Sequence, residues 1–397
     1  MVGPMSKYEP LDLVEAAFIG RGSVGVYATM FFDGRIDVDK LSDAVIRVGS
    51  LVPETLCSID VGHMRYIPVA LPDVVSEIPE PVSVGFKWDP ETDTQVKILV
   101  GHGADADSMI IGLTHVVVDG IGLRQYASLL ADAYNGSLPR LRNVRSISSI
   151  LKGKKVGEPT DGEKTAATLG DQSFLLPHEG EQRFLRRVTV PAETMSSIHE
   201  RARSQGVTLN DVFIAACVRV VSRRLDLPVV RMPCPVNLRQ FGNVGPLSVA
   251  NMSGILQASF PVGRGDSFSD TVGMVHRELA EMQARNRCLD GLARFSSICR
   301  WVPLRLLKTI ARGSFSIPAI IYSNCGALDP LSFGDTSAVS YFINSQYRPN
   351  YQVALTVTSY QGSTTFVHSL RGDEEGANAG EAVMNQIVDE CESWLTE

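Results

Sequence analysis

Apolar and polar residues alternate along the chain with two different periods, and the period changes several times. Residues 24–32 are rich in β-branched and aromatic side chains, which is typical of a strand. After the turn signal Asp33-Gly34, apolar residues in 37–48 recur every three or four positions, which predicts an amphipathic helix. The same reasoning predicts strands at 64–69, 95–100 and 109–114 and a helix at 121–134. The first part of the chain therefore mixes strands and helices.

The second part repeats this mixture. Thr208 and Asp211 stand three residues apart before an apolar run, an arrangement typical of a capping box that starts a helix. Helices are predicted at 192–204, 212–225, 267–285 and 374–395, and strands at 229–235, 251–260, 317–323, 338–344, 352–360 and 363–370. The stretch between the parts has no sustained period. We therefore predict an α/β protein with an N-terminal subdomain at 1–150, a linker at 151–185 and a C-terminal subdomain at 186–397.

Size and charge narrow the class of protein. The chain has 397 residues, of which 44% are hydrophobic, so it can bury a large core and is not wholly disordered. The net charge of -7 argues against general nucleic-acid binding, because phosphate contacts need clustered Lys and Arg. No apolar run approaches the roughly 20 residues that span a bilayer, and the first ten residues are polar. We expect a cytoplasmic protein without a membrane span.

Three kinds of site are disfavoured by spacing. The seven cysteines are scattered without a Cys-x-x-Cys pair, which favours reduced thiols over a disulfide or zinc framework. No His-Glu-x-x-His or comparable spacing predicts a metal. Residues 20–25 spell Gly-x-Gly-x-x-Gly, but a strand follows this segment instead of preceding it. A dinucleotide-binding loop needs the opposite order.

The most informative segment is 109–122, in which an apolar strand is followed by His-Val-Val-Val-Asp-Gly. This places His115 at a strand end, where the side chain can point into a cleft. Imidazole exchanges protons near neutral pH, which suits a general base. Asp119 would fix the loop by pairing with a cation elsewhere, and Gly120 permits backbone angles that other residues resist. The alternative is a packed histidine followed by an ordinary Asp-Gly turn.

This motif and four further segments, in the same order, resemble the chloramphenicol acetyltransferase-like superfamily. Its members include the condensation domains of nonribosomal peptide synthetases and the polyketide-associated acyltransferases, to which this chain is most similar, and they share the signature HxxxDG. The other matching segments are FDGRIDVDKL at 32–41, TLNDV at 208–212, PVNLR at 235–239 and YSNCG at 322–326. The resemblance covers nearly the whole chain. It implies two chloramphenicol acetyltransferase-like subdomains, each a mixed sheet flanked by helices, with an active-site tunnel between them.

The resemblance also implies a role for each matching residue. His115 would act as the general base, and Gly120 would offer its backbone N–H to the developing oxyanion. Asp119 would be structural and would pair with Arg239. If both side chains of this pair are buried, loss of one leaves an uncompensated charge, which would damage folding as well as chemistry.

The remaining matches come from the second part of the chain. Asn237, two residues before Arg239, would support the site. Ser323 and Asn324 would face the same cleft as oxyanion or substrate contacts, although polar residues at strand ends are commonly caps. Cys325 is better explained as a small buried side chain than as a nucleophile.

The activity implied by the resemblance is acyl transfer from a thioester to a hydroxyl or amine of a small-molecule acceptor. Acyl-coenzyme A is favoured as donor over the acyl-phosphopantetheine of an acyl carrier protein, and no permanently bound cofactor is expected. Thr114 replaces the first histidine of the HHxxxDG form, as in single-histidine acyltransferases. A free-standing condensation or off-loading enzyme and a catalytically silent binding module are the alternatives. We expect a monomer.

A basic stretch follows the first predicted subdomain. Its members are Arg140, Arg142, Arg145, Lys152, Lys154 and Lys155. These side chains would attract the phosphates of coenzyme A or the acidic face of a carrier protein. The alternative is a solvated linker, because runs of charge are usually exposed.

Overall fold

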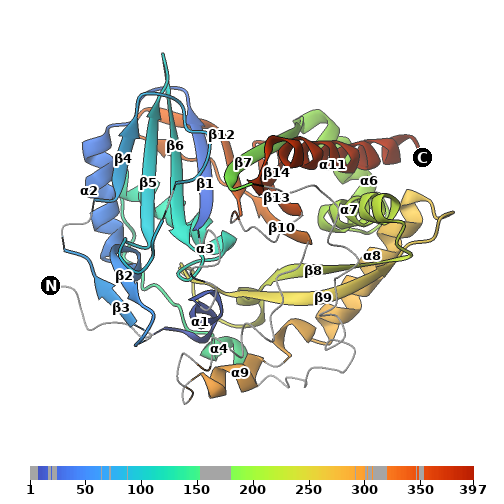
Figure 1. Ribbon diagram of the computed structural model, residues 1–397, viewed down its shortest axis with the longest axis horizontal. Helices are drawn as coiled ribbons and strands as arrows, with labels where there is room; N and C mark the ends of the chain where they lie inside the picture. Colours follow the sequence, from blue (N-terminus) through green and yellow to red (C-terminus); the bar gives the residue numbers. More distant parts are fainter. Residues whose placement is uncertain are drawn as a thin grey trace.

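Two mixed β-sheets, each with its own hydrophobic core, organise the molecule (Figure 1). The computed structural model describes residues 8–16, 19, 25–63, 65–70, 73–86, 88–152, 180–290, 292–299, 302, 306, 320–345, 347 and 353–397. The predicted mixed α/β architecture is confirmed.

The first sheet has six strands in the order β11-β12-β1-β6-β5-β4, and only β4 and β5 pair in parallel. Helices α2 and α3 contribute their apolar faces to its core. The elements are β1 (Gly25–Phe32), α2 (Val38–Gly49), β4 (Val75–Ile78), β5 (Val96–His102), β6 (Asp107–Thr114), α3 (Gly120–Tyr134), β11 (Ser332–Phe333) and β12 (Thr336–Asn344).

The second sheet has four strands in the order β10-β13-β14-β7, with β10 and β13 parallel. Helices α6, α7 and α11 pack on it, and α8 packs on α7 and on the β8–β9 ribbon. The elements are β7 (Gln182–Val190), α6 (Ala192–Ser204), α7 (Leu209–Leu225), β8 (Val229–Asn237), β9 (Ser253–Pro261), α8 (Phe268–Ala284), β10 (Ile320–Ala327), β13 (Val353–Tyr360), β14 (Ser363–Gly372) and α11 (Glu374–Ser393).

Shorter elements complete the described part of the chain. Several lie below the first sheet in Figure 1, near the point where the two halves meet. They are α1 (Pro10–Ala16), η1 (Pro53–Leu56), β2 (Cys57–Asp60), β3 (Arg65–Pro68), α4 (Ser148–Leu151), η3 (Leu238–Phe241), η4 (Arg287–Leu289), α9 (Leu292–Ile298) and η5 (Trp394–Thr396).

The chain crosses from the second half back to the first near its end. Strands β11 and β12 lie in the segment predicted as the C-terminal subdomain, yet they belong to the first sheet. There β12 pairs with β1, with Met30 opposite Tyr341. The two halves are therefore joined by sheet pairing as well as by the chain. The predicted boundaries between the subdomains and the linker otherwise stay predictions.

The predicted linker at 151–185 falls largely outside the described residues, because 153–179 are not described. Its last residues, from Gln182 onward, lie in strand β7. The other predicted elements agree with the observed ones within a few residues, although 317–319 of one predicted strand are also outside the described residues. The predicted capping box is present, with Thr208 and Asp211 bonded to each other's backbone at the start of α7.

Candidate active site

Strand β6 carries the chain to His115 through the middle of the first sheet. All eight residues of β6 are buried, and it pairs with β1 on one side and β5 on the other. The half-buried His115 is the first residue beyond the strand. Its ring Nδ1 is buried and has no hydrogen-bond partner among the described residues. The imidazole is therefore held at a strand end without being committed to a neighbouring side chain at that nitrogen.

Thr114, the residue before His115, is bonded to a neighbouring side chain of the first half. The fully buried Thr114 hydroxyl donates to Gln95 Oε1 at 2.7 Å. Thr114, which stands at the position of the first histidine in the HHxxxDG form, is thus bonded inside the first half.

The turn after His115 is tightly bonded to its surroundings. Val117 N and Val118 N both donate to Thr114 O, at 3.0 and 3.2 Å. Asp119 is the N-cap of α3, because its Oδ1 accepts from Gly122 N at 2.7 Å. This cap satisfies one of the N–H groups that the first turn of a helix leaves without an intrahelical partner.

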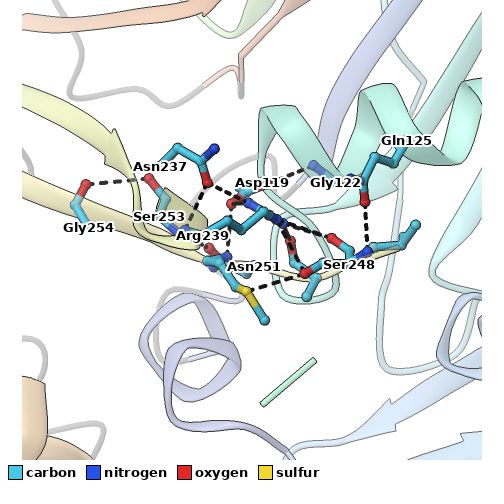
Figure 2. Close-up of polar contacts among 12 residues, drawn as sticks. Asp119, Gly122, Gln125, Asn237, Arg239, Ser248, Asn251, Ser253 and Gly254 are labelled. Atoms are coloured by element: carbon cyan, nitrogen blue, oxygen red, sulfur yellow. Dashed lines mark hydrogen bonds and ion pairs between the residues drawn. The ribbon is translucent and has the colours of Figure 1, made fainter. Parts of the chain in front are cut away.

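The second carboxylate oxygen of Asp119 reaches the other half of the molecule. Asp119 Oδ2 accepts from Arg239 Nη1 at 2.7 Å (Figure 2). The same oxygen accepts from Met252 N at 2.8 Å. The Asp119 and Arg239 side chains are only 6% and 7% exposed. The ion pair implied by the resemblance is present and buried. Both Asp119 oxygens accept bonds from groups other than the His115 ring, so this carboxylate holds the turn instead of orienting the imidazole.

Arg239 has acceptors for its remaining N–H groups. Its Nη2 donates to Ser248 O at 2.9 Å and to Ala250 O at 2.8 Å, and its Nη1 also lies 3.2 Å from Asn237 Oδ1. The loop that provides these carbonyls is itself tied to α3, since Ser248 N donates to Gln125 Oε1 at 2.9 Å (Figure 2). Asn237, predicted as site support, thus contacts Arg239 directly.

One contributor was missed by the sequence analysis. Asn251 donates through Nδ2 to His115 O at 3.1 Å, and its Oδ1 accepts from Ser253 N at 3.3 Å. Asn251 is 5% exposed. In the sequence it reads as an ordinary polar residue at a strand start, and only the approach of β9 to the motif turn reveals its role.

The loop before β9 serves both cores. Leu247 and Val249 are buried in the first core, whereas Ala250 and Met252 are buried in the second. Asp119 N also donates to Ala250 O at 3.2 Å. Because the loop is packed from both sides, it fixes the motif turn relative to the second half.

Gly120 and Gly122 are the points of closest approach at this turn. A Cβ on Gly120 would lie 2.7 Å from Cys325 Sγ, and a Cβ on Gly122 would lie 2.7 Å from Ala250 O. The N–H of Gly120, like other N–H groups in the first turn of a helix, has no acceptor among the described residues, and its use for an oxyanion stays a prediction.

Strand β10 reaches the motif turn through Cys325. This cysteine is buried, and burial raises the pKa of its thiol to about 12, so it is a poor nucleophile at neutral pH. Ser323 is half-buried on the same strand. Asn324 is exposed and donates to Asn210 Oδ1 at 3.1 Å, at the start of α7. The structure thus bonds Asn324 to the second half and not to the motif turn.

Comparison with solved structures identifies the fold. No protein-family model and no curated protein matches the sequence. The first condensation domain of the calcium-dependent antibiotic synthetase matches with a TM-score of 0.69 and 16% identity, over 100% of this chain and 97% of that one. Polyketide synthase associated protein 5 from Mycobacterium tuberculosis matches with a TM-score of 0.72 and 15% identity, over 100% and 99%. The chain has the chloramphenicol acetyltransferase-like fold.

A third solved structure extends this finding. Trichothecene 15-O-acetyltransferase from Fusarium sporotrichioides matches with a TM-score of 0.66 and 11% identity, over 98% of this chain and 95% of that one. At such identities the likeness establishes the chloramphenicol acetyltransferase-like fold, as the sequence predicted. The roles of individual residues rest on the site geometry.

The basic stretch that follows α3 divides into two parts in this fold. Arg140, Arg142 and Lys152 are exposed, whereas Arg145 is bonded to Asp12 at 2.7 Å in the interior. Arg145 was therefore wrongly grouped with the surface charges, because its charge is already compensated. Lys154 and Lys155 lie outside the described residues.

Other features of the described residues do not mark a second site. No three His, Cys, Asp or Glu side chains gather there as potential metal ligands. Surface hollows of about 560 and 330 Å³ lie beside α7 and α11, and neither is lined by a residue of the motif turn. The tunnel implied by the resemblance stays a prediction. Over the same ranges, no helix is both long and apolar enough to cross a membrane.

The contact between Gly120 and Cys325 gives a testable prediction. Alanine usually favours a helix over glycine by about 1 kcal/mol, but here its Cβ would lie 2.7 Å from Cys325 Sγ. We expect Gly120→Ala to lower the free energy of unfolding by about 1–3 kcal/mol, since overpacking typically costs this much. Cys325→Ala in the same chain should recover part of the loss, as measured by urea unfolding.

Gly122→Ala is the matched control, because its Cβ would meet the backbone oxygen of Ala250. Cys325→Ala should not rescue that variant. A Gly120→Ala protein as stable as the wild type would contradict the close packing of this turn, and so would equal rescue of both glycine variants.

Proposed function

We propose that this protein is an acyltransferase that moves an acyl group from a thioester to a hydroxyl or amine, with His115 as the general base. The observation that carries the proposal is the placement of His115. It follows the central strand of the first sheet, its carbonyl is held by a residue of the second half, and its Nδ1 has no partner among the described residues. Because Nδ1 is itself buried, the acceptor has to approach the other ring nitrogen, Nε2, for a proton transfer.

The proposed reaction needs one base and one oxyanion donor. A ring nitrogen of His115 takes the proton of the acceptor O–H or N–H as the acceptor attacks the thioester carbonyl. The Gly120 N–H, at the start of α3, stabilises the negative oxygen of the tetrahedral intermediate. Collapse of the intermediate breaks the C–S bond, and the imidazolium returns its proton to the departing thiolate. No covalent enzyme intermediate is required.

The fold relatives support this reaction class. One is named a 15-O-acetyltransferase, which describes the transfer of an acetyl group to an oxygen, and another is named a condensation domain. We keep acyl-coenzyme A as the favoured donor, and the exposed Arg140, Arg142 and Lys152 would supply positive charge that attracts its phosphates. A small-molecule acceptor and a monomeric chain remain predictions.

The first test is removal of the base. His115→Gln should lower the rate of thiol release from acetyl- or butyryl-coenzyme A, in the presence of a panel of alcohols and amines, by about 10²–10⁴-fold. His199→Gln, which changes an exposed histidine on α6, is the control and should retain the wild-type rate. A folded His115→Gln protein with full transfer activity would overturn the proposal.

A second candidate function is a free-standing condensation or off-loading enzyme that uses a carrier-protein thioester. The likeness to condensation domains favours it. The comparison that separates the two uses one acyl group, presented either on coenzyme A or on the phosphopantetheine arm of a carrier protein. We expect kcat/KM to be about tenfold higher or more with coenzyme A, a difference of about 1.4 kcal/mol.

A higher kcat/KM with the carrier-protein thioester than with acyl-coenzyme A would show that the carrier protein is the donor. Binding of acyl-coenzyme A without consumption of either thioester would instead indicate a catalytically silent binding module.

A further inference from the structure

The middle of the motif turn is held by a side chain that none of the matching segments contains. Val117 lies halfway between His115 and Asp119 and is fully buried. Its carbonyl oxygen accepts a hydrogen bond from Arg145 Nη1 at 3.1 Å. A buried carbonyl needs a partner, and a guanidinium is a strong one because its donors carry charge. Arg145 therefore fixes the backbone two residues beyond the proposed base.

Arg145 is itself held in place by a buried cluster. Its Nη2 donates to Asp12 Oδ2 at 2.7 Å and to Tyr66 Oη at 3.1 Å, and its Nε lies 3.7 Å from Glu54 Oε1. The side chains of Arg145, Asp12 and Glu54 are 10%, 1% and 7% exposed. The cluster gathers α1, η1 and β3 of the first half around one guanidinium. It is separate from the Arg239 network, which comes from the second half.

The segment that carries Arg145 also contacts the loop bonded to Arg239. Asn143 accepts from Val249 N at 2.7 Å and donates to Val249 O at 3.0 Å. Val144 N donates to Leu247 O at 3.1 Å. Residues 143–145 thus touch the motif turn and the loop before β9 at once. Movement of residues 143–145 would therefore displace both the motif turn and the loop before β9.

Alternate residues of the motif are therefore held by three side chains from different parts of the chain. Asn251 bonds the carbonyl of His115, Arg145 bonds the carbonyl of Val117, and Arg239 bonds the carboxylate of Asp119.

We propose that Arg145 is a positioning residue for His115, an inference that rests on the proposed function of that histidine. Without its guanidinium, Val117 O would lose its donor and the turn would shift to find another. A displacement of about 1 Å at a reacting group can cost about 10²-fold in rate. Lysine cannot replace Arg145, because a single ammonium does not span Val117 O, Asp12 and Tyr66 as a planar fork does.

The test reads the His115 ring directly. Histidine-labelled ¹⁵N protein gives one ring spin system for each of the seven histidines, and His115→Gln assigns the signal of interest. We expect Arg145→Lys to displace the His115 ring signals. We also expect it to lower kcat with butyryl-coenzyme A by about 10–100-fold, with a smaller change in KM.

The matched control is Arg219→Lys on α7. Like Arg145, Arg219 donates to a carboxylate, that of Glu390, and to backbone carbonyls, those of Asp266 and Ser267. All of these partners belong to the second half. It should lower the thermal unfolding midpoint without moving the His115 signals. Tyr66→Phe is a milder variant that removes one acceptor of Arg145 and keeps the packing. It should move the His115 signals in the same direction as Arg145→Lys, and by less.

The His115 ring signals test this inference separately from the proposed function. Displaced His115 signals in Arg145→Lys and in Tyr66→Phe, with unchanged signals in Arg219→Lys, support positioning whether or not a thioester is consumed. A folded Arg145→Lys protein whose His115 signals match those of Arg219→Lys overturns the proposal. If Arg145→Lys does not fold, unchanged His115 signals in Tyr66→Phe overturn it.

Discussion

The buried ion pair between Asp119 and Arg239 is the constraint on which the arrangement of the site depends. Removing two charges from water costs several kcal/mol for each ion, and their attraction offsets this only when the remaining donors and acceptors are also bonded. Here Asp119 accepts from Gly122 N, Met252 N and Arg239, while Arg239 also donates to Ser248 O and Ala250 O. Separating the halves would expose all of these groups together. The pair therefore fixes the start of α3 against β8 and β9.

The residue type at each position of the HxxxDG segment follows from this constraint. Aspartate is needed because one carboxylate must cap α3 and also meet an arginine of the other half. Glycine is needed because Cys325 Sγ approaches the turn too closely for a side chain. The three valines pack fully into the core. Histidine is the residue whose side chain these contacts leave uncommitted at Nδ1. Structural contacts thus account for every position of the segment except that of His115, the proposed general base.

Local patterns predicted most of the fold, and contacts between distant segments explain what they missed. Periodic segments such as α2 and β6 bury one face or both, so their apolar residues reveal them. Residues 182–185 of strand β7 were assigned to the linker because the sequence shows no sustained period there. The strand contacts distant segments instead, since Arg187 lies over the rings of Phe31 and Phe342 of the first sheet at 5.2 and 5.1 Å. Arg145 was read as a surface charge because its partners, Asp12 and Glu54, lie far away in sequence. Arg239 was found only because a matching segment marked it.

A double-mutant cycle on the Asp119–Arg239 pair measures this coupling most directly. Asp119→Asn, Arg239→Met and the double variant are compared with the wild type by their free energies of unfolding in urea. Each single variant should lose about 3–5 kcal/mol, because it leaves one buried charge uncompensated. The double variant should lose less than the sum of the two by about 2 kcal/mol or more. Additive losses would show that the two side chains stabilise the protein independently, which would contradict a turn held by their mutual bond.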